Sequence, residues 1–292
     1  MNAASALHSA ASVPAVTAPR AEPFFLAAAS GQRFGLFYPP AGVCRGAVLY
    51  VHPFGEEMNK ARRMAAMQAR ALAALGVGVL ALDLAGCGDS SGDFGEARWE
   101  LWRDDLALGQ QWLQQRLGVP VSLFGLRLGA LLALDYARSA PSALERLVLW
   151  QPVQSGATFL TQFLRLRIAN DMLAEGGEKS GGTQALRDAL RAGQVLEIAG
   201  YDLAPELAAA IDVLDAAKLS VNGTPVHWLE AVSADGRALS PAGAKVTAAW
   251  QQAGVDLHVH LVTCAPFWAT QEITECPALI SATSAIFATV TA

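Results

Sequence analysis

The sequence predicts an α/β fold, a doubly wound and mostly parallel sheet with an inserted helical cap. Short apolar runs rich in Val and Leu alternate with longer segments of helical periodicity, which is typical of a parallel sheet covered by helices. Several of these apolar runs lead directly into glycine-rich loops. The alternation then breaks between residues 155 and 218, where the successive patterns are helical.

The first half of the core is predicted from alternating strand and helix signals. We expect an edge strand within 33–40, stopped by two prolines, and a buried strand within 46–55 that runs into a loop. Ala, Met and Leu at helical spacing predict a helix over 60–76 that ends at a glycine. A strand within 77–93 leads into a glycine-rich loop. Residues 98–118 return as a helix whose apolar stripe consists of Trp99, Trp102, Leu106 and Leu113.

The second half begins with the central strand of the predicted sheet, over 120–125, which turns sharply into a helix. Another strand is expected over 144–153. After the helical segment the alternation resumes with a strand over 224–232, a helix over 241–254 and a strand over 255–262.

These elements divide the chain into three parts. Residues 1–22 are rich in Ala, Ser and Pro and have no basic start, which predicts a disordered tail and argues against a secretory signal. Residues 23–154 and 219–292 form the core, and residues 155–218 form a helical cap over one end of the sheet. The cap carries apolar residues that suit an acyl ligand or plain core packing, namely Phe159, Phe163, Leu164 and Leu166.

The composition excludes several classes of partner. The chain has 292 residues, 53% of them hydrophobic and 16% charged, enough for one large domain or two small ones with a sizeable core. A net charge of −5 without a dense run of Lys or Arg argues against nucleic-acid binding. No stretch of about 18 uninterrupted apolar residues is present, so we expect no membrane span. Four cysteines without CxxC or metal-ligand spacing predict reduced thiols in a cytoplasmic protein that needs no metal or cofactor.

Three motifs follow one another along the chain. The first is a strand that ends in "HPFG", and the second is a loop of the Asp-x-x-Gly-x-Gly-x-Ser-x-Gly type, formed by Asp83, Gly86, Gly88, Ser90 and Gly92. The third is the stretch "FGLRLGALLALDYA" (124–137), which has the Gly-x-Ser-x-Gly spacing of a nucleophile elbow, but Arg127 replaces the serine. In this order the three motifs resemble the α/β-hydrolase fold.

A closer resemblance covers roughly residues 25–280. The strings "YVHPFGEEMNKARRMAAMQARALA", "GCGDSSGDF", "GLRLGALLALD" and "LWQPVQSGATFLTQFLRLRIANDML" are similar to those of the exosortase A system-associated hydrolase 2 family. That resemblance implies a hydrolase encoded beside PEP-CTERM protein sorting and exopolysaccharide genes in Gram-negative bacteria. It also implies a partner protein from the exosortase pathway, and it names no substrate.

The residues of the elbow do not support ordinary serine chemistry. A guanidinium stays protonated, so Arg127 can neither attack a carbonyl nor act as a general base. Gly125 and Gly129 have a steric role, because the elbow packs backbone tightly between strand and helix. His52 begins the oxyanion segment at the end of its strand, or alternatively caps backbone groups there. The backbone N–H groups of Phe54 and Leu128 occupy the two oxyanion-donor positions.

The acid and the histidine of a triad are also in doubt. Asp235 is a weak candidate for the acid, with Glu230 second. No histidine follows residue 260, and "TCAPFWATQE" stands where one is needed. The three late histidines alternate with apolar residues and are expected on exposed strand faces, at His227, His258 and His260.

Three interpretations of the elbow remain open. Arg127 forms a structural ion pair with Glu57 or Glu56, which lie with Gly55 on the loop after the strand; we favour the pair with Glu57. The ion pair would rigidify an inactive hydrolase, or a pseudo-hydrolase that binds a ligand or a partner protein. Alternatively Arg127 receives an anionic, carboxylate, acyl or sugar-phosphate ligand. The third interpretation is hydrolysis by another route, with Ser90, Ser91 or Cys87 as nucleophile, or Glu57 or Asp83 activating water.

Overall fold

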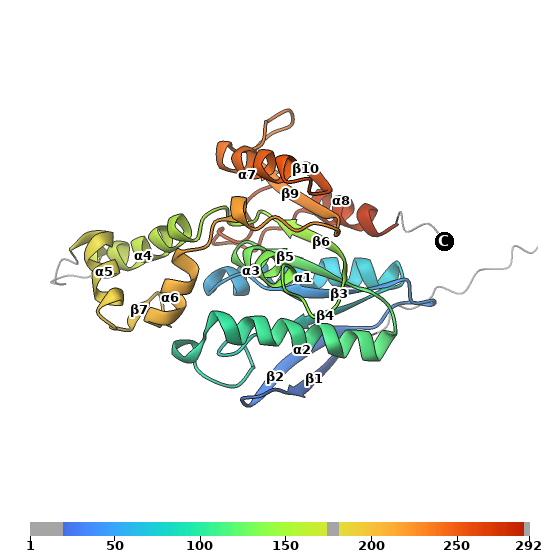
Figure 1. Cartoon of the computed structure of the whole chain (residues 1–292), viewed down its shortest axis with the longest axis horizontal. Coiled ribbons are helices and arrows are strands. Elements are labelled where there is room, and N and C mark those ends of the chain that lie inside the picture. The colour runs from blue at the N-terminus through green and yellow to red at the C-terminus, as the bar shows by residue number, and fades with distance from the viewer. Residues whose placement is uncertain (1–19, 174–180, 289–292) are drawn as a thin grey trace, which may run out of the picture.

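The computed structural model describes residues 20–173 and 181–288, and its centre is one eight-stranded sheet, drawn in Figure 1. The strand order is β1-β2-β4-β3-β5-β6-β9-β10. All neighbours from β4 to β10 are parallel, whereas β2 is antiparallel to both β1 and β4. The predicted doubly wound, mostly parallel sheet is confirmed. Its strands are β1 (Glu22–Ala27), β2 (Gln32–Tyr38), β3 (Gly46–Val51), β4 (Val77–Leu82), β5 (Val121–Leu126), β6 (Leu144–Trp150), β9 (Val226–Val232) and β10 (Leu257–Thr263).

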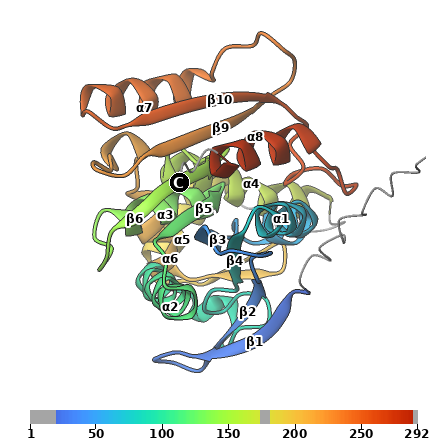
Figure 2. The ribbon, with the colours of Figure 1, turned by 90° about the vertical axis from the view of Figure 1, so that its right-hand side faces the viewer.

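Helices cover both faces of this sheet, as Figure 2 shows. One face packs on α1 (Glu56–Ala74) and α8 (Pro277–Ala288), and the other on α2 (Trp99–Leu117), α3 (Leu128–Ala137) and α7 (Pro241–Gln252). The strands buried on both sides are nearly all apolar, which is why β3 and β5 have no exposed residue. The predicted stripe of Trp99, Trp102, Leu106 and Leu113 on α2 is buried.

The segment between β6 and β9 stays outside the main sheet. It contains α4 (Gly156–Leu173), α5 (Gly182–Arg191), α6 (Pro205–Asp212) and the short 3₁₀ helix η2 (Ala216–Lys218). A hairpin of β7 (Leu196–Ile198) and β8 (Tyr201–Leu203), which the sequence did not predict, pairs only with itself. This segment extends from one end of the molecule in Figure 1, at the carboxyl ends of the parallel strands.

Four further features differ from the sequence prediction. Residues 33–40 are not the edge strand, because β1 pairs outside β2. Glu22, which we assigned to the tail, opens β1, while residues 1–19 lie outside the described residues. The helix predicted from residue 60 begins at Glu56, so Glu56 and Glu57 form its first turn and are not on a loop. The C-terminal helix α8 was not predicted.

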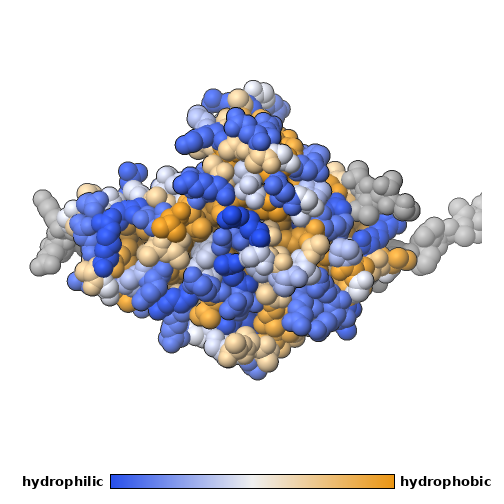
Figure 3. All heavy atoms as spheres, viewed as in Figure 1, coloured by the Kyte–Doolittle hydropathy of each residue, from blue (hydrophilic) through white to orange (hydrophobic). Residues whose placement is uncertain are grey.

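The surface drawn in Figure 3 is a patchwork of hydrophilic and apolar residues. Within residues 20–173 and 181–288, we find no helix with the length and apolar character to cross a membrane.

Candidate functional site

The elbow keeps the tight backbone of a strand–turn–helix junction. Arg127, between β5 and α3, has φ 56° and ψ −119°, a strained conformation for a residue with a side chain. A Cβ on Gly125 would lie 2.5 Å from Cα of Ala130, and one on Gly129 would lie 2.3 Å from the His52 carbonyl oxygen. Both glycines are therefore needed for backbone to approach backbone, as the sequence predicted.

The Arg127 side chain is held between a carboxylate and an indole. Its Nε donates to Glu57 Oε1 at 3.1 Å, and the two side chains are 17% and 23% exposed. Its guanidinium carbon lies 5.6 Å from the ring centroid of Trp268, which is buried. The ion pair that we favoured is thus present, and it involves Glu57. Glu56 instead accepts from Asn59 and lies beside the Tyr201 hydroxyl of β8.

Trp268 occupies the loop after β10, where a triad would require its histidine. The elbow position of the nucleophile is therefore held by a cation, and that cation contacts an aromatic ring on the loop that would carry the base. The absence of a late histidine is visible in the sequence, whereas this contact is not. The adjacent aromatic pair "FW" in "TCAPFWATQE" was the available signal, since Trp is the ring that best attracts a cation.

Glu57 has an unusual environment for a carboxylate. Its Oε2 is buried and has no hydrogen-bond partner among the residues that the structure describes. Burial raises the pKa of Glu57, although the charge of Arg127 acts in the opposite direction. Its place in the first turn of α1 also favours a negative charge there. Only one of the two carboxylate oxygens of Glu57 therefore accepts a hydrogen bond.

A cavity of about 180 Å³ lies between the elbow and α4. Its apolar wall is built around Phe54, whose ring packs edge-on against Phe159 at 5.5 Å and Phe163 at 5.0 Å between centroids. Leu164, which we grouped with these residues, is fully buried in the core instead. The cavity is lined by Phe54, Glu56, Glu57, Arg127, Phe159, Gln162, Phe163 and Leu166.

Two backbone donors are unused, one on a residue that lines this cavity and one on the residue that follows Arg127. Neither the Phe54 N–H nor the Leu128 N–H donates a hydrogen bond to any residue in the described part of the chain. Leu128 is the first residue of α3, where such N–H groups are unpaired and attract negative charge. These are the two positions that we assigned to oxyanion donors. Gly55, with φ 55°, makes the turn from Phe54 into α1.

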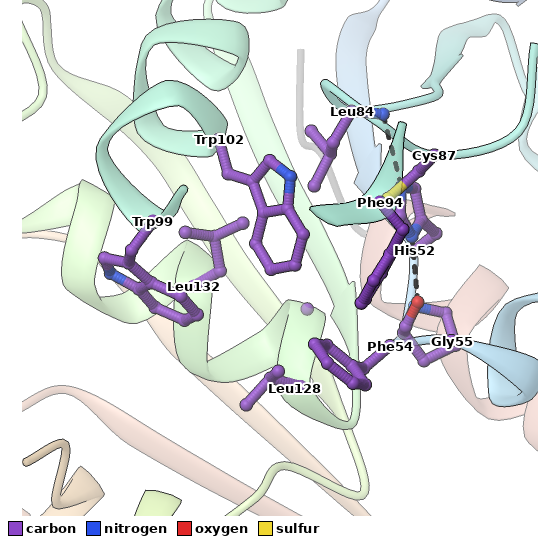
Figure 4. Close-up of a pocket in the computed structure, with 12 residues that line it drawn as sticks. His52, Phe54, Gly55, Leu84, Cys87, Phe94, Trp99, Trp102, Leu128 and Leu132 are labelled. Atoms are coloured by element: carbon purple, nitrogen blue, oxygen red, sulfur yellow. Dashed lines mark hydrogen bonds between the residues drawn. The ribbon is translucent and has the colours of Figure 1, made fainter. Parts of the chain in front are cut away.

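His52 is a structural residue with both ring nitrogens occupied (Figure 4). Its Nδ1–H donates to the Pro53 carbonyl oxygen at 2.8 Å, and its Nε2 accepts from the Leu84 N–H at 3.3 Å. Burial lowers the pKa of His52, so it is the neutral form that makes both bonds. The neighbouring cavity drawn in Figure 4 holds about 10 Å³, room for one water. His52 therefore fixes β3 to the loop after β4 and cannot act as a base.

The alternative nucleophiles also have structural roles, because the two serines hydrogen-bond to backbone groups and the cysteine is buried. Ser90 Oγ donates to the Asp83 carbonyl oxygen at 2.5 Å, and Ser91 Oγ accepts from the Gln32 N–H at 2.9 Å. Burial raises the pKa of the Cys87 thiol, which leaves it without thiolate character. Asp83 accepts from the Asp89 N–H at 3.0 Å. Among residues 20–173 and 181–288, no serine, threonine or cysteine hydrogen-bonds to a histidine.

The structure does not bring the candidate acids to a histidine. Asp235, in the loop after β9, accepts a hydrogen bond from the Thr263 hydroxyl. Glu230 is buried and accepts from the Ser240 N–H at 2.7 Å and from the Trp228 indole at 3.2 Å. Both carboxylates serve the local structure around β9 and β10.

The late histidines form a cluster of their own on β9 and β10. His227 and His258 are paired across the strands, with ring centroids 4.7 Å apart, and His260 Nε2 lies 3.3 Å from His227 Nδ1. Exposed strand faces were expected for these histidines, and their stacking was not predicted. Only His258 fits that expectation well, being about half exposed. The described residues contain no group of His, Cys, Asp and Glu arranged to hold a metal ion.

This cluster predicts a loss of stability in acid. Burial and the neighbouring His258 and His260 lower the pKa of His227 to about 4. As the pH falls below about 6.5, the unfolded chain binds a proton that folded His227 refuses, so stability is lost until the pH nears 4. Between pH 7 and pH 4.5 the wild type should lose roughly 1–2 kcal/mol more than His227→Gln. Urea unfolding at both pH values measures the difference, and equal losses in the two proteins would contradict it.

Comparisons with known proteins agree with this architecture. The family model described as serine aminopeptidase, S33 matches residues 42–183, a little under half of the chain. Est1E from Butyrivibrio proteoclasticus, solved with ferulic acid bound, is 12% identical with a TM-score of 0.62, over 91% of this chain and 96% of that one. A soluble variant of monoglyceride lipase from Saccharomyces cerevisiae, in complex with a substrate analogue, is 15% identical with a TM-score of 0.62, over 93% and 96%.

A thermostable carboxyl esterase from Bacillus coagulans is 16% identical with a TM-score of 0.61, over 91% of this chain and 97% of that one. No curated protein sequence matches. At these identities the likeness concerns the fold, and it confirms the α/β-hydrolase fold that the three motifs resembled.

Proposed function

We propose that this chain, with an α/β-hydrolase fold, binds a small uncharged acyl or ester ligand without covalent chemistry in the cavity beside Arg127. The observation that carries the proposal is the presence of Arg127 at the elbow position where a hydrolase would have its nucleophile. At the elbow position where a nucleophile would be required, Arg127 is paired with Glu57 and packed on Trp268, and the loop that carries Trp268 has no histidine. A protonated guanidinium in that place cannot form an acyl-enzyme.

The cavity suits a carbonyl compound better than an anion. The unused N–H groups of Phe54 and Leu128 can donate to a carbonyl oxygen, and the aromatic wall can cover an apolar body. The charge of Arg127 is already balanced by Glu57, and Glu56 adds a further acid to the cavity wall. An anion would find no unpaired cation here, which disfavours the use of Arg127 as an anion receptor.

Two of the similar structures support a small ligand, since ferulic acid is bound in one and a substrate analogue in the other. The resemblance to the exosortase A system-associated hydrolase 2 family supports a ligand from that export and exopolysaccharide system. A cytoplasmic location and a protein partner from the same system stay predictions.

A second candidate function is slow hydrolysis with Glu57 as the general base. It is favoured by the position of this carboxylate on the cavity wall and by its raised pKa, which suit a group that takes a proton from water. The same N–H donors would then hold the carbonyl oxygen of the ester.

A fluorophosphonate probe and short p-nitrophenyl esters separate these functions. We expect no labelling and no turnover above background, because no described hydroxyl is paired with a histidine. Turnover without labelling that disappears in Glu57→Gln would establish the second candidate. Stoichiometric labelling of a serine would overturn both.

Binding is tested with butyl butyrate, a neutral ester, by thermal stabilisation. Leu166→Gln should weaken binding several-fold, because Leu166 lines the cavity yet is 47% exposed, so the change is tolerated by the fold. Met172→Gln is the matched control, since Met172 lies on the same helix and is 80% exposed away from the cavity. Absence of stabilisation in the wild type, or equal stabilisation in all three proteins, would refute the site.

A further inference from the structure

A second and larger cavity lies between α1 and strands β2, β4 and β3, on the face of the sheet that α1 covers. It encloses about 280 Å³ and shares no lining residue with the cavity beside Arg127. Its walls are mainly apolar, and they include Leu36, Ala65, Ala66, Ala69, Val79 and Phe124. The volume is nearly twice that of the roughly 150 Å³ engineered cavities that take up benzene.

The cavity exists because α1 turns alanines toward the strands. In "KARRMAAMQARALAALG", the middle of the helix places Ala65, Ala66 and Ala69 at the cavity wall, where larger apolar side chains would fill it. An unfilled volume of this size lowers the stability of a fold. A bound molecule would offset that loss.

Two tyrosine hydroxyls on the cavity wall have no partner. Tyr38 is 4% exposed and Tyr50 is 7% exposed, and neither hydroxyl forms a hydrogen bond with any residue that the structure describes. Neither oxygen is itself buried away from the cavity, so both hydroxyls are open to a bound molecule and can donate to an acceptor on it. Burial raises the pKa of both phenols, which keeps them protonated and able to donate.

The charges at the two ends of the cavity differ. Arg62 and Arg70 are eight residues apart on α1, or about 12 Å along its axis. Arg62 lies 3.9 Å from the carboxylate of Asp83, which compensates it. Arg70 lies 5.9 Å from the Tyr38 ring centroid, and no carboxylate of residues 20–173 or 181–288 forms a salt bridge with it. One end is therefore neutral overall and the other is positive.

We propose that this cavity is a binding site for a monoanionic amphiphile, a carboxylate on an apolar body. The carboxylate lies between the Arg70 guanidinium and the Tyr38 hydroxyl, and the apolar body runs along the alanines of α1. Bonds from a guanidinium and a phenol to a carboxylate are charge-assisted, and the alkyl part gains from leaving water. The site goes beyond the proposed function, because its ligand is charged and its residues are different.

Isothermal titration with decanoate tests the site, with decanol as the uncharged molecule of equal length. Decanoate should bind at least about tenfold more tightly than decanol. Arg70→Gln should weaken decanoate binding about tenfold and Tyr38→Phe about fivefold, while decanol binding stays unchanged in both. Ala66→Leu, which fills the cavity, should weaken both ligands.

Three controls locate the ligand. Arg63→Gln removes the same charge from α1 at a residue that does not line the cavity, and it should leave decanoate binding unchanged. Leu166→Gln, in the cavity beside Arg127, should also leave it unchanged. Decanoate binding that is lost in Leu166→Gln, or that is as strong in Arg70→Gln and Ala66→Leu as in the wild type, overturns the proposal. A larger effect of Arg62→Gln than of Arg70→Gln overturns the placement of the carboxylate.

Discussion

Arg127→Ala should lower the free energy of unfolding by about 2–3 kcal/mol, which corresponds to a fall in melting temperature of several degrees. The change strands Glu57, a carboxylate whose second oxygen already lacks a partner. Loss of one member of a fully buried pair costs more, and the partial exposure of both side chains reduces the figure here. The effect is measured by thermal and urea unfolding of the two proteins.

The cause of that loss can be checked in two ways. In the double variant Arg127→Ala with Glu57→Gln, no charge is stranded, so much of the stability should return. Without Arg127 the pKa of Glu57 rises further above its unfolded value, so the deficit should grow as the pH rises from 5 to 8. A drop of only a degree or two in Arg127→Ala would show that the ion pair does not hold the elbow.

Asp105→Ala should have the largest effect on stability, a loss of about 3–5 kcal/mol. Its Oδ1 accepts from Arg33 Nε at 2.6 Å, and the two side chains are 3% and 2% exposed. Its Oδ2 accepts from the Ala85 N–H at 2.7 Å. Removing this carboxylate therefore leaves a buried guanidinium without its counter-charge and a buried N–H without its acceptor.

An exposed pair provides the matched control. Asp188 and Arg191 on α5 are each 61% exposed, so Asp188→Ala should change the free energy of unfolding by less than about 0.5 kcal/mol. Urea unfolding of both variants measures the contrast. If Asp105→Ala stays within about 1 kcal/mol of the wild type, the buried pair contributes far less than its geometry implies.

The fold was predictable because its signals are local. Apolar runs, helical spacing and glycine at residue 76 predicted most strands and helices of the sheet to within a few residues. β1 was missed because Glu22–Ala27 has only six residues, mostly exposed, beside an Ala- and Pro-rich segment. Its assignment depends on pairing with β2, a non-local contact that no periodicity in the sequence reveals.

The candidate site was predictable in part. The glycine spacing predicted that Arg127 stands at a tight strand–helix turn between two glycines. The order of strands predicted that Glu57 would lie near Arg127. Trp268 could not be placed, because its contact with Arg127 spans 141 positions of the chain and depends on how the loop after β10 folds back. Arg33 and Asp105 were overlooked, since charged residues are seldom fully buried and nothing in their neighbourhood indicates it.

The insertion between β6 and β9 also has a consequence for synthesis on the ribosome. The parallel neighbour of β6 is β9, and residues 151–225 separate them in the chain. At about 5–20 residues per second, these 75 positions take roughly 4–15 seconds to translate. Throughout that interval the apolar strand "LERLVLW" is an unpaired edge, which is where nascent chains associate with one another or are bound by chaperones.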